Sequence, residues 1–68
     1  MMKLFKLSRQ VGIDERPRVR MGIESCGPTK GISWFASDCV LVELPDGADP
    51  YAVLSRIGSL LKYQGLVD

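Results

Sequence analysis

The strongest structural signal in the 68-residue chain lies at residues 49–66, DPYAVLSRIGSLLKYQGL. Asp49 can cap a helix N-terminus, because its side-chain oxygen can accept a hydrogen bond from a free amide of the first turn. Pro50 suits the first helical position, where a missing N–H costs nothing. Apolar residues then recur at three- and four-residue spacing and form one stripe: Val53, Leu54, Ile57, Leu60 and Leu61. The stretch predicts an amphipathic helix that begins at Pro50.

Two glycines add detail to this helix. Gly65 suits the left-handed conformation that follows many helices, and Leu66 can then fold back onto Leu61 in a Schellman ending. Gly58, in the middle of the helix, costs up to about 1 kcal/mol of helix propensity. We expect this glycine to allow a close approach of the helix to a sheet.

Four upstream segments have strand-like patterns, at residues 3–11, 18–25, 32–37 and 39–44. In the second, Val19, Met21 and Ile23 alternate with polar residues, which is the period of a half-buried strand. Turn residues separate the segments, including the glycine-bounded stretch 27–31. The prediction is one α+β domain over residues 1–68. It consists of a four-stranded antiparallel sheet (a meander) with one C-terminal helix packed on one face.

The strand register decides which residues that helix leaves uncovered. Pairing the second and third segments places Trp34 under the helix and Phe35 on the other face, opposite Gly22, and an aromatic ring can cover a strand glycine. The next hairpin has two interpretations. A three-residue loop, 37–39, puts Val40, Val42 and Leu44 inward and Leu41 outward near Phe35, whereas a two-residue loop, 37–38, reverses every side chain. The first is favoured because it agrees with an inward Trp34.

Composition argues against catalysis. The chain has no histidine, so it lacks the commonest general base and metal ligand, and its formal net charge is only +1. No motif for a catalytic, cofactor or metal site is found. Cys26 and Cys39 flank one predicted strand at opposite ends, too far apart for a disulfide. Two free thiols indicate a reducing compartment, and no apolar stretch is long enough for a signal peptide or a bilayer span, so a cytoplasmic location is expected.

The candidate binding residues are basic and apolar. Charges are uneven, because the first half of the chain is basic and the second half is acidic. On a strand, Arg16, Arg18 and Arg20 would share a face and could bind carboxylates or phosphates in bidentate fashion. An exposed apolar spot around Phe35 needs a partner or a second copy of the chain. The predicted partner-binding residues are Arg16, Arg18, Arg20, Lys30, Phe35 and Leu41.

The short, histidine-free profile without a chemical motif is similar to that of small phage and mobile-element proteins that inhibit host machinery, anti-CRISPR proteins among them. The resemblance implies a non-catalytic inhibitor that occupies a nucleic-acid or subunit site on a larger protein complex. Two alternatives are nucleic-acid binding by the basic strand face and a structural role as a homodimer. The first predicts affinity that falls steeply with salt.

Overall fold

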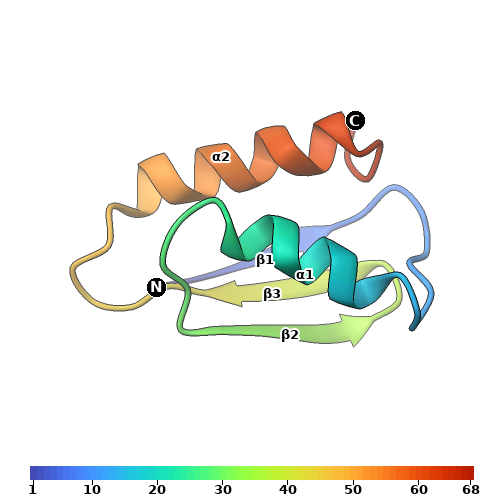
Figure 1. Cartoon of the computed structure of the whole chain (residues 1–68), viewed down its shortest axis with the longest axis horizontal. Helices are drawn as coiled ribbons and strands as arrows, with labels where there is room; N and C mark the ends of the chain where they lie inside the picture. The colour runs from blue at the N-terminus through green and yellow to red at the C-terminus, as the bar shows by residue number, and fades with distance from the viewer.

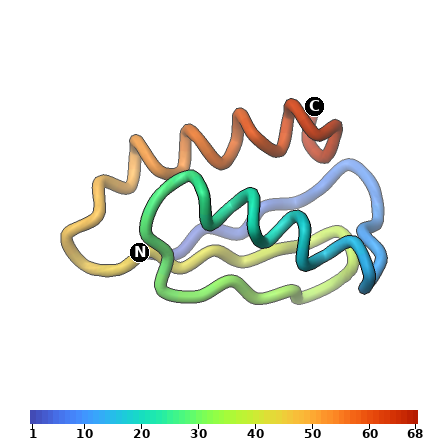
Figure 2. Tube along the Cα trace, viewed as in Figure 1, coloured from blue at the N-terminus to red at the C-terminus, as the bar shows by residue number.

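A computed structural model describes all residues, 1–68, as one layer of sheet and one layer of helices (Figure 1). The elements along the chain are β1 (Met2–Lys6), α1 (Arg16–Glu24), β2 (Gly31–Ala36), β3 (Cys39–Glu43) and α2 (Pro50–Tyr63). Both helices lie on the same side of the sheet, and the other side is bare (Figures 1 and 2). The α+β class is therefore confirmed, but the sheet has three strands and the chain has two helices.

The sheet is antiparallel with the strand order β1-β3-β2, so the predicted meander is wrong. The last strand, β3, lies in the centre and pairs with both others, through Phe5↔Val40 on one side and Trp34↔Val40 on the other. β1 and β2 thus run parallel to each other with β3 between them, and α1 connects them as in a split β-α-β unit. Both β1 and β2 are edge strands.

The predicted second strand is the helix α1. Its sequence RPRVRMGIE fits the two-residue period of a strand and also the 3.6-residue period of a helix. Val19 and Ile23 are four residues apart and therefore share a face in either structure. Met21 distinguishes the two structures: it would be inward in a strand, yet it is 70% exposed. Pro17 near the helix start is compatible with α1, since the first-turn amides have no intrahelical partner. The predicted cover of Gly22 by Phe35 is therefore also wrong.

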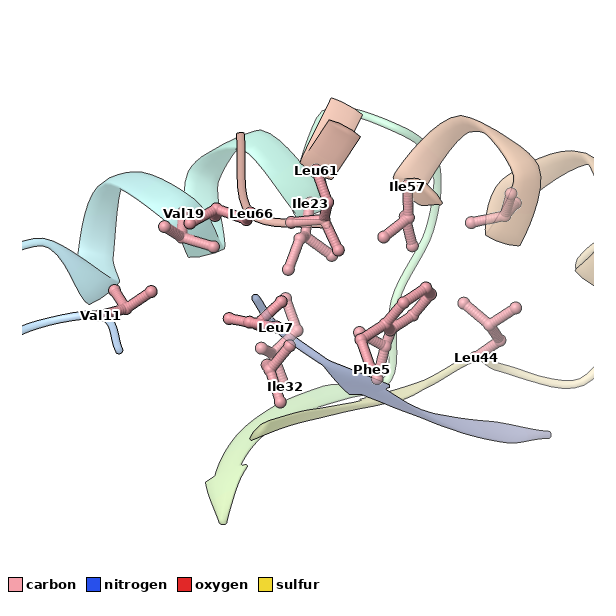
Figure 3. Packing of buried hydrophobic residues seen from close by; sticks show 13 residues of the cluster. Phe5, Leu7, Val11, Val19, Ile23, Ile32, Leu44, Ile57, Leu61 and Leu66 are labelled. Atoms are coloured by element: carbon pink, nitrogen blue, oxygen red, sulfur yellow. The ribbon is translucent and has the colours of Figure 1, made fainter. Parts of the chain in front are cut away.

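The core lies between the two layers and is entirely apolar (Figure 3). Val19 and Ile23 come from α1, and Val53, Ile57 and Leu61 from α2. The sheet and the connecting segments contribute the other eight buried residues: Phe5, Leu7, Val11, Ile32, Val40, Val42, Leu44 and Leu66. A helix with its side chains is about 10 Å wide and three strands span about 14 Å, so one helix could not cover this face.

The ends of α2 are as predicted. The Asp49 side chain accepts hydrogen bonds from the amides of Tyr51 and Ala52. At the other end Gly65 has φ +74°, and the Leu66 amide donates to the Leu61 carbonyl at 2.8 Å, which is the Schellman pattern. Leu66 is 1% exposed, so this ending also closes the core.

The close approach through a helical glycine occurs at Gly22 instead of Gly58. A Cβ at Gly22 would lie 2.9 Å from Cδ2 of Leu60, where α1 and α2 contact each other. A Cβ at Gly58 would meet no atom within 4 Å. The expectation for Gly58 is wrong, because this half-buried glycine has no neighbouring atom that a Cβ would displace.

The β2–β3 hairpin combines features of both predicted registers. Its turn has two residues, Ser37 and Asp38, but Phe35 is a bulge between the pairs Trp34↔Val40 and Ala36↔Cys39. The extra residue restores the side-chain alternation, so Val40, Val42 and Leu44 are buried as the favoured interpretation requires. The three-residue loop is wrong, whereas the assignment of faces is confirmed.

Candidate interaction surfaces

The polar and charged side chains of the protein all lie at its surface. No group of three or more Cys, Asp or Glu side chains is close enough to hold a metal ion, and no polar or charged residue is buried. Cys26 and Cys39 are free thiols, as predicted. The surface has two hollows, and each borders α1. Interaction surfaces are therefore the features to describe.

The larger such surface is the uncovered side of the sheet, which we call the open face. Alternation of side chains places Met2 and Leu4 of β1 and Leu41 of β3 on it, and Phe35 is also exposed. Phe35 is 67% exposed, Met2 61% and Leu4 50%, while Leu41 in the centre is half-buried by its neighbours. The sequence correctly predicted that Phe35 and Leu41 are not in the core. It missed Met2 and Leu4, because β1 was not expected beside β3.

Ion pairs surround the apolar centre of the open face. At one end of the strands, Nζ of Lys6 donates a hydrogen bond to the carboxylate of Asp38. At the other end, Nζ of Lys30 lies 3.6 Å from a carboxylate oxygen of Glu43. The hydrogen bond from Lys6 holds the pKa of Asp38 below its ordinary value and raises the pKa of Lys6. Lys30 is thus at the rim of the open face, already beside an acidic partner.

The three predicted arginines do not share a face. They lie on α1, where residues 16 and 20 are one turn apart and residue 18 points to the opposite side. Arg16 and Arg20 border one hollow, together with Ile13, Pro17 and Trp34. Arg18 borders the other, beside Glu15 and Gln64. The prediction that the three arginines share one strand face is therefore wrong, because it assumed a strand at residues 18–25, where the structure has the helix α1.

Arg16 is held in place by two contacts. Its guanidinium lies over the Trp34 ring, 5.1 Å from the ring centroid, and its Nε donates to the Val11 carbonyl at 3.3 Å. Trp34 is half-buried and packs against the core cluster, so the predicted inward position is correct, although the ring lies at the core's edge. Arg20 has a looser contact, with its Nε 3.7 Å from a Glu24 carboxylate oxygen. No acidic residue borders the hollow between Arg16 and Arg20.

On the Arg18 side the charges compensate each other. Arg9 makes a bidentate contact with Glu15, at 2.7 and 3.2 Å, and this hydrogen bonding lowers the pKa of the Glu15 carboxyl. Arg18 adds a smaller attraction to the same carboxylate. This side of α1 is therefore less suited to an anionic partner than the Arg16 side.

Two tyrosines of α2 are almost fully exposed. Tyr51 is 84% exposed and Tyr63 is 90% exposed. Both point away from the core on α2, at opposite ends of that helix. They are separate from the open face, which makes Tyr63 useful as a control position.

Comparison with known proteins identifies no relative. No protein-family model matches the chain, and neither the curated proteins nor the solved structures contain a match. No helix has the length and apolar character needed to cross a membrane. The surfaces themselves are therefore the basis for a functional proposal.

Proposed function

We propose that this protein is a non-catalytic binding module that docks on a larger protein through the open face of its sheet. The observation that carries the proposal is that both helices cover the same side of the sheet (Figure 1). Strand alternation places the exposed Met2 and Leu4 on the other side, and Phe35 is exposed at the bulge of β2. Isolated exposed apolar residues are common, but a contiguous apolar face with a charged rim is typical of an interaction surface.

The dimensions of the open face favour a partner larger than a second copy. Three strands of five or six residues span roughly 240 Å² at their usual spacings. A stable interface buries about 800 Å² on each partner. Two copies in contact through this face alone fall well short of that area. A larger partner that also covers the rim and an adjoining strand edge would reach it.

The distribution of cations favours a protein partner over a nucleic acid. Of the nine Lys and Arg residues, four are in ion pairs: Lys6, Arg9, Arg20 and Lys30. The other five are divided among three elements: Lys3 on β1, Arg16 and Arg18 on opposite sides of α1, and Arg56 and Lys62 on α2. Binding to a phosphate backbone usually requires clustered basic residues.

The mode of action in this proposal is steric. With no catalytic group on the open face, the module would act by occupying a site on its partner, as the small phage and mobile-element inhibitors do. The free thiols Cys26 and Cys39 support a reducing, cytoplasmic setting.

A paired substitution tests the proposal. Leu4→Glu introduces a charge on the open face, and Tyr63→Glu introduces the same charge on α2, at a residue that is 90% exposed. Both variants should remain folded, because neither residue is in the core. We expect the immobilised wild-type protein and Tyr63→Glu to retain the same protein from a lysate of the source cell, and Leu4→Glu to lose it.

Three outcomes would contradict the proposal. One is retention of the same partner by Leu4→Glu. Another is a wild-type dimer in light scattering that Leu4→Glu dissociates, which would assign the open face to a second copy. The third is a nucleic-acid complex whose affinity falls steeply with salt and does not respond to Leu4→Glu.

A further inference from the structure

The free edge of β2 and the arginines above it are separate from the open face and suggest a second kind of binding. We propose that this edge accepts an extended peptide segment of a partner protein by strand addition, and that Arg16 and Arg20 bind a Glu or Asp side chain of that segment. We call this the edge site. It is defined by Ile32 and Trp34 of β2 and by Arg16 and Arg20 of α1.

The hydrogen-bonding pattern shows which backbone groups are available. The amides of Leu44 and Leu7 donate to the carbonyls of Met1 and Asp38, so the even-numbered residues of β3 bond to β1. By alternation the odd-numbered residues of β3 bond to β2 through Gly31 and Ser33. The N–H and C=O groups of Ile32 and Trp34 then point away from β3. No hydrogen bond outside the strand ladder involves either residue.

Trp34 connects this backbone edge to the arginines. Its backbone is at the free edge, while its ring forms the floor of the hollow bordered by Arg16 and Arg20. A peptide residue paired with Trp34 would point to the same side of the sheet as the ring, because directly opposite residues share a face. Its side chain would therefore lie beside the Arg16 guanidinium.

The charge of the hollow identifies the side chain that would fit. No carboxylate borders it, and the one acidic neighbour, Glu24, is 3.7 Å from Arg20 with no hydrogen bond. Stacking on Trp34 and the Nε contact to Val11 fix the Arg16 guanidinium, so its remaining N–H groups are oriented in advance. A carboxylate can accept two parallel hydrogen bonds from such a group.

The bulge at Phe35 sets the length of the edge site. It interrupts the ladder immediately after Trp34, so regular pairing is offered over residues 31–34 only. Such a short edge is a weak template for indiscriminate sheet extension. Binding would depend on the carboxylate in addition to the backbone bonds, which gives the site its specificity for an acidic strand.

Defined peptides test the edge site without knowledge of the natural partner. The probe is a capped peptide, Ser-Thr-Val-Glu-Val-Thr-Ser, compared with its Glu→Gln form and with a form in which proline replaces both valines. Trp34 is the only tryptophan, so its fluorescence reports binding directly. Backbone amide shifts in NMR spectra locate the bound peptide, and we expect the largest shifts at Ile32 and Trp34.

Two arginine substitutions and a matched control give the expected differences. Because charge-assisted hydrogen bonds are lost, Arg16→Gln should bind the Glu peptide about 10- to 100-fold more weakly than the wild type does. The wild-type protein should bind the Gln peptide more weakly than the Glu peptide by a similar factor. Arg20→Gln, which removes no contact with the core, should weaken the Glu peptide by a smaller factor. Arg18→Gln removes the same charge from the other side of α1 and should leave binding unchanged. The proline peptide should not bind.

The proposal is overturned if the Glu and Gln peptides bind equally, or if Arg18→Gln has as large an effect as Arg16→Gln. Amide shifts at β1 in place of β2 would also overturn it. If inorganic phosphate displaced the peptide with a dissociation constant as low as that of the peptide, the site would be a general anion site and not a peptide site. Leu4→Glu should leave peptide binding intact, so failure of the open-face proposal and failure of this one are distinguishable.

Discussion

Two glycines of this chain should respond in opposite directions to the same substitution. Gly58 lies inside α2, and a Cβ added there would meet nothing within 4 Å. Gly27 has φ +153°, and a Cβ added there would lie 2.9 Å from Cγ2 of Val53. Alanine at Gly58 should therefore stabilise the protein, and alanine at Gly27 should destabilise it.

The magnitudes follow from the local structure. Gly58→Ala removes the backbone-entropy cost of glycine in a helix, a gain of about 0.5–1 kcal/mol, or about 2–8 °C in Tm for a domain of this size. Gly27→Ala adds backbone strain of about 1–3 kcal/mol. It also adds overpacking of about 1–3 kcal/mol against Val53, a stiff β-branched side chain that is 3% exposed. The total free energy of unfolding of a domain of this length is roughly 3–10 kcal/mol, so the Gly27→Ala variant should be close to unfolding.

Urea denaturation of the three proteins measures these changes. Trp34 fluorescence reports tertiary structure and far-ultraviolet circular dichroism reports the helices, so coincident transitions would establish two-state unfolding. The midpoint should rise for Gly58→Ala and fall for Gly27→Ala, with unchanged slopes. Equal midpoints for the two variants would refute the close contact between Gly27 and Val53 of α2, and a lower midpoint for Gly58→Ala than for the wild type would refute the open surroundings of Gly58.

Three further predictions concern the cap, the core and the ion pairs. Asp49→Ala removes the acceptor of the Tyr51 and Ala52 amides and should cost about 0.5–2 kcal/mol in urea denaturation, whereas Asp49→Asn should retain most of the stability. Ile57→Val deletes one methylene from a residue with 0% exposure and should cost about 0.5–1.5 kcal/mol; a neutral effect would place Ile57 outside the core. Ion pairing lowers the pKa of Glu15 and of Asp38 below their ordinary values of 4.5 and 3.8. Their contribution to stability is therefore complete above those values and is lost as the pH falls through the lowered ones. Denaturation midpoints of a Glu15→Gln, Asp38→Asn double variant should depend less on pH in this acid range, and a dependence equal to that of the wild type would show that the pairs do not form.

Local signals were sufficient for α2 and for the existence of β2 and β3, but not for the turn between these two strands. The cap at Asp49, the left-handed Gly65 and the burial of Leu66 depend on interactions within a few residues, so the sequence could predict them. The outward position of Phe35 was also correct, although the reason given, a covered Gly22, was not. The bulge that produces this position depends on β3 pairing and has no clear signature in residues 31–36.

Residues 16–24 show where local patterns are insufficient. Val19 and Ile23 fit the period of a strand and that of a helix equally well. A nine-residue segment is too short for intrinsic propensity to decide between the two structures, since most helical stability comes from packing. The candidate site changed with this assignment. Arg16 and Arg20 became neighbours of Trp34, Arg18 moved to the opposite side of the helix, and Lys30 and Leu41 stayed with the sheet.

The sequence by itself determined the buried stripe of α2 (Val53, Ile57 and Leu61), the ends of that helix and the absence of histidine, because each is a property of residue types and short spacings. Only the tertiary structure decided that β3 is central and that α1 lies beside α2. The physical reason is that an exposed strand face of this width requires two helices for cover, and Gly22 lets them approach closely. That arrangement leaves one face of the sheet bare and places Arg16 over Trp34, so both proposed binding surfaces result from long-range packing.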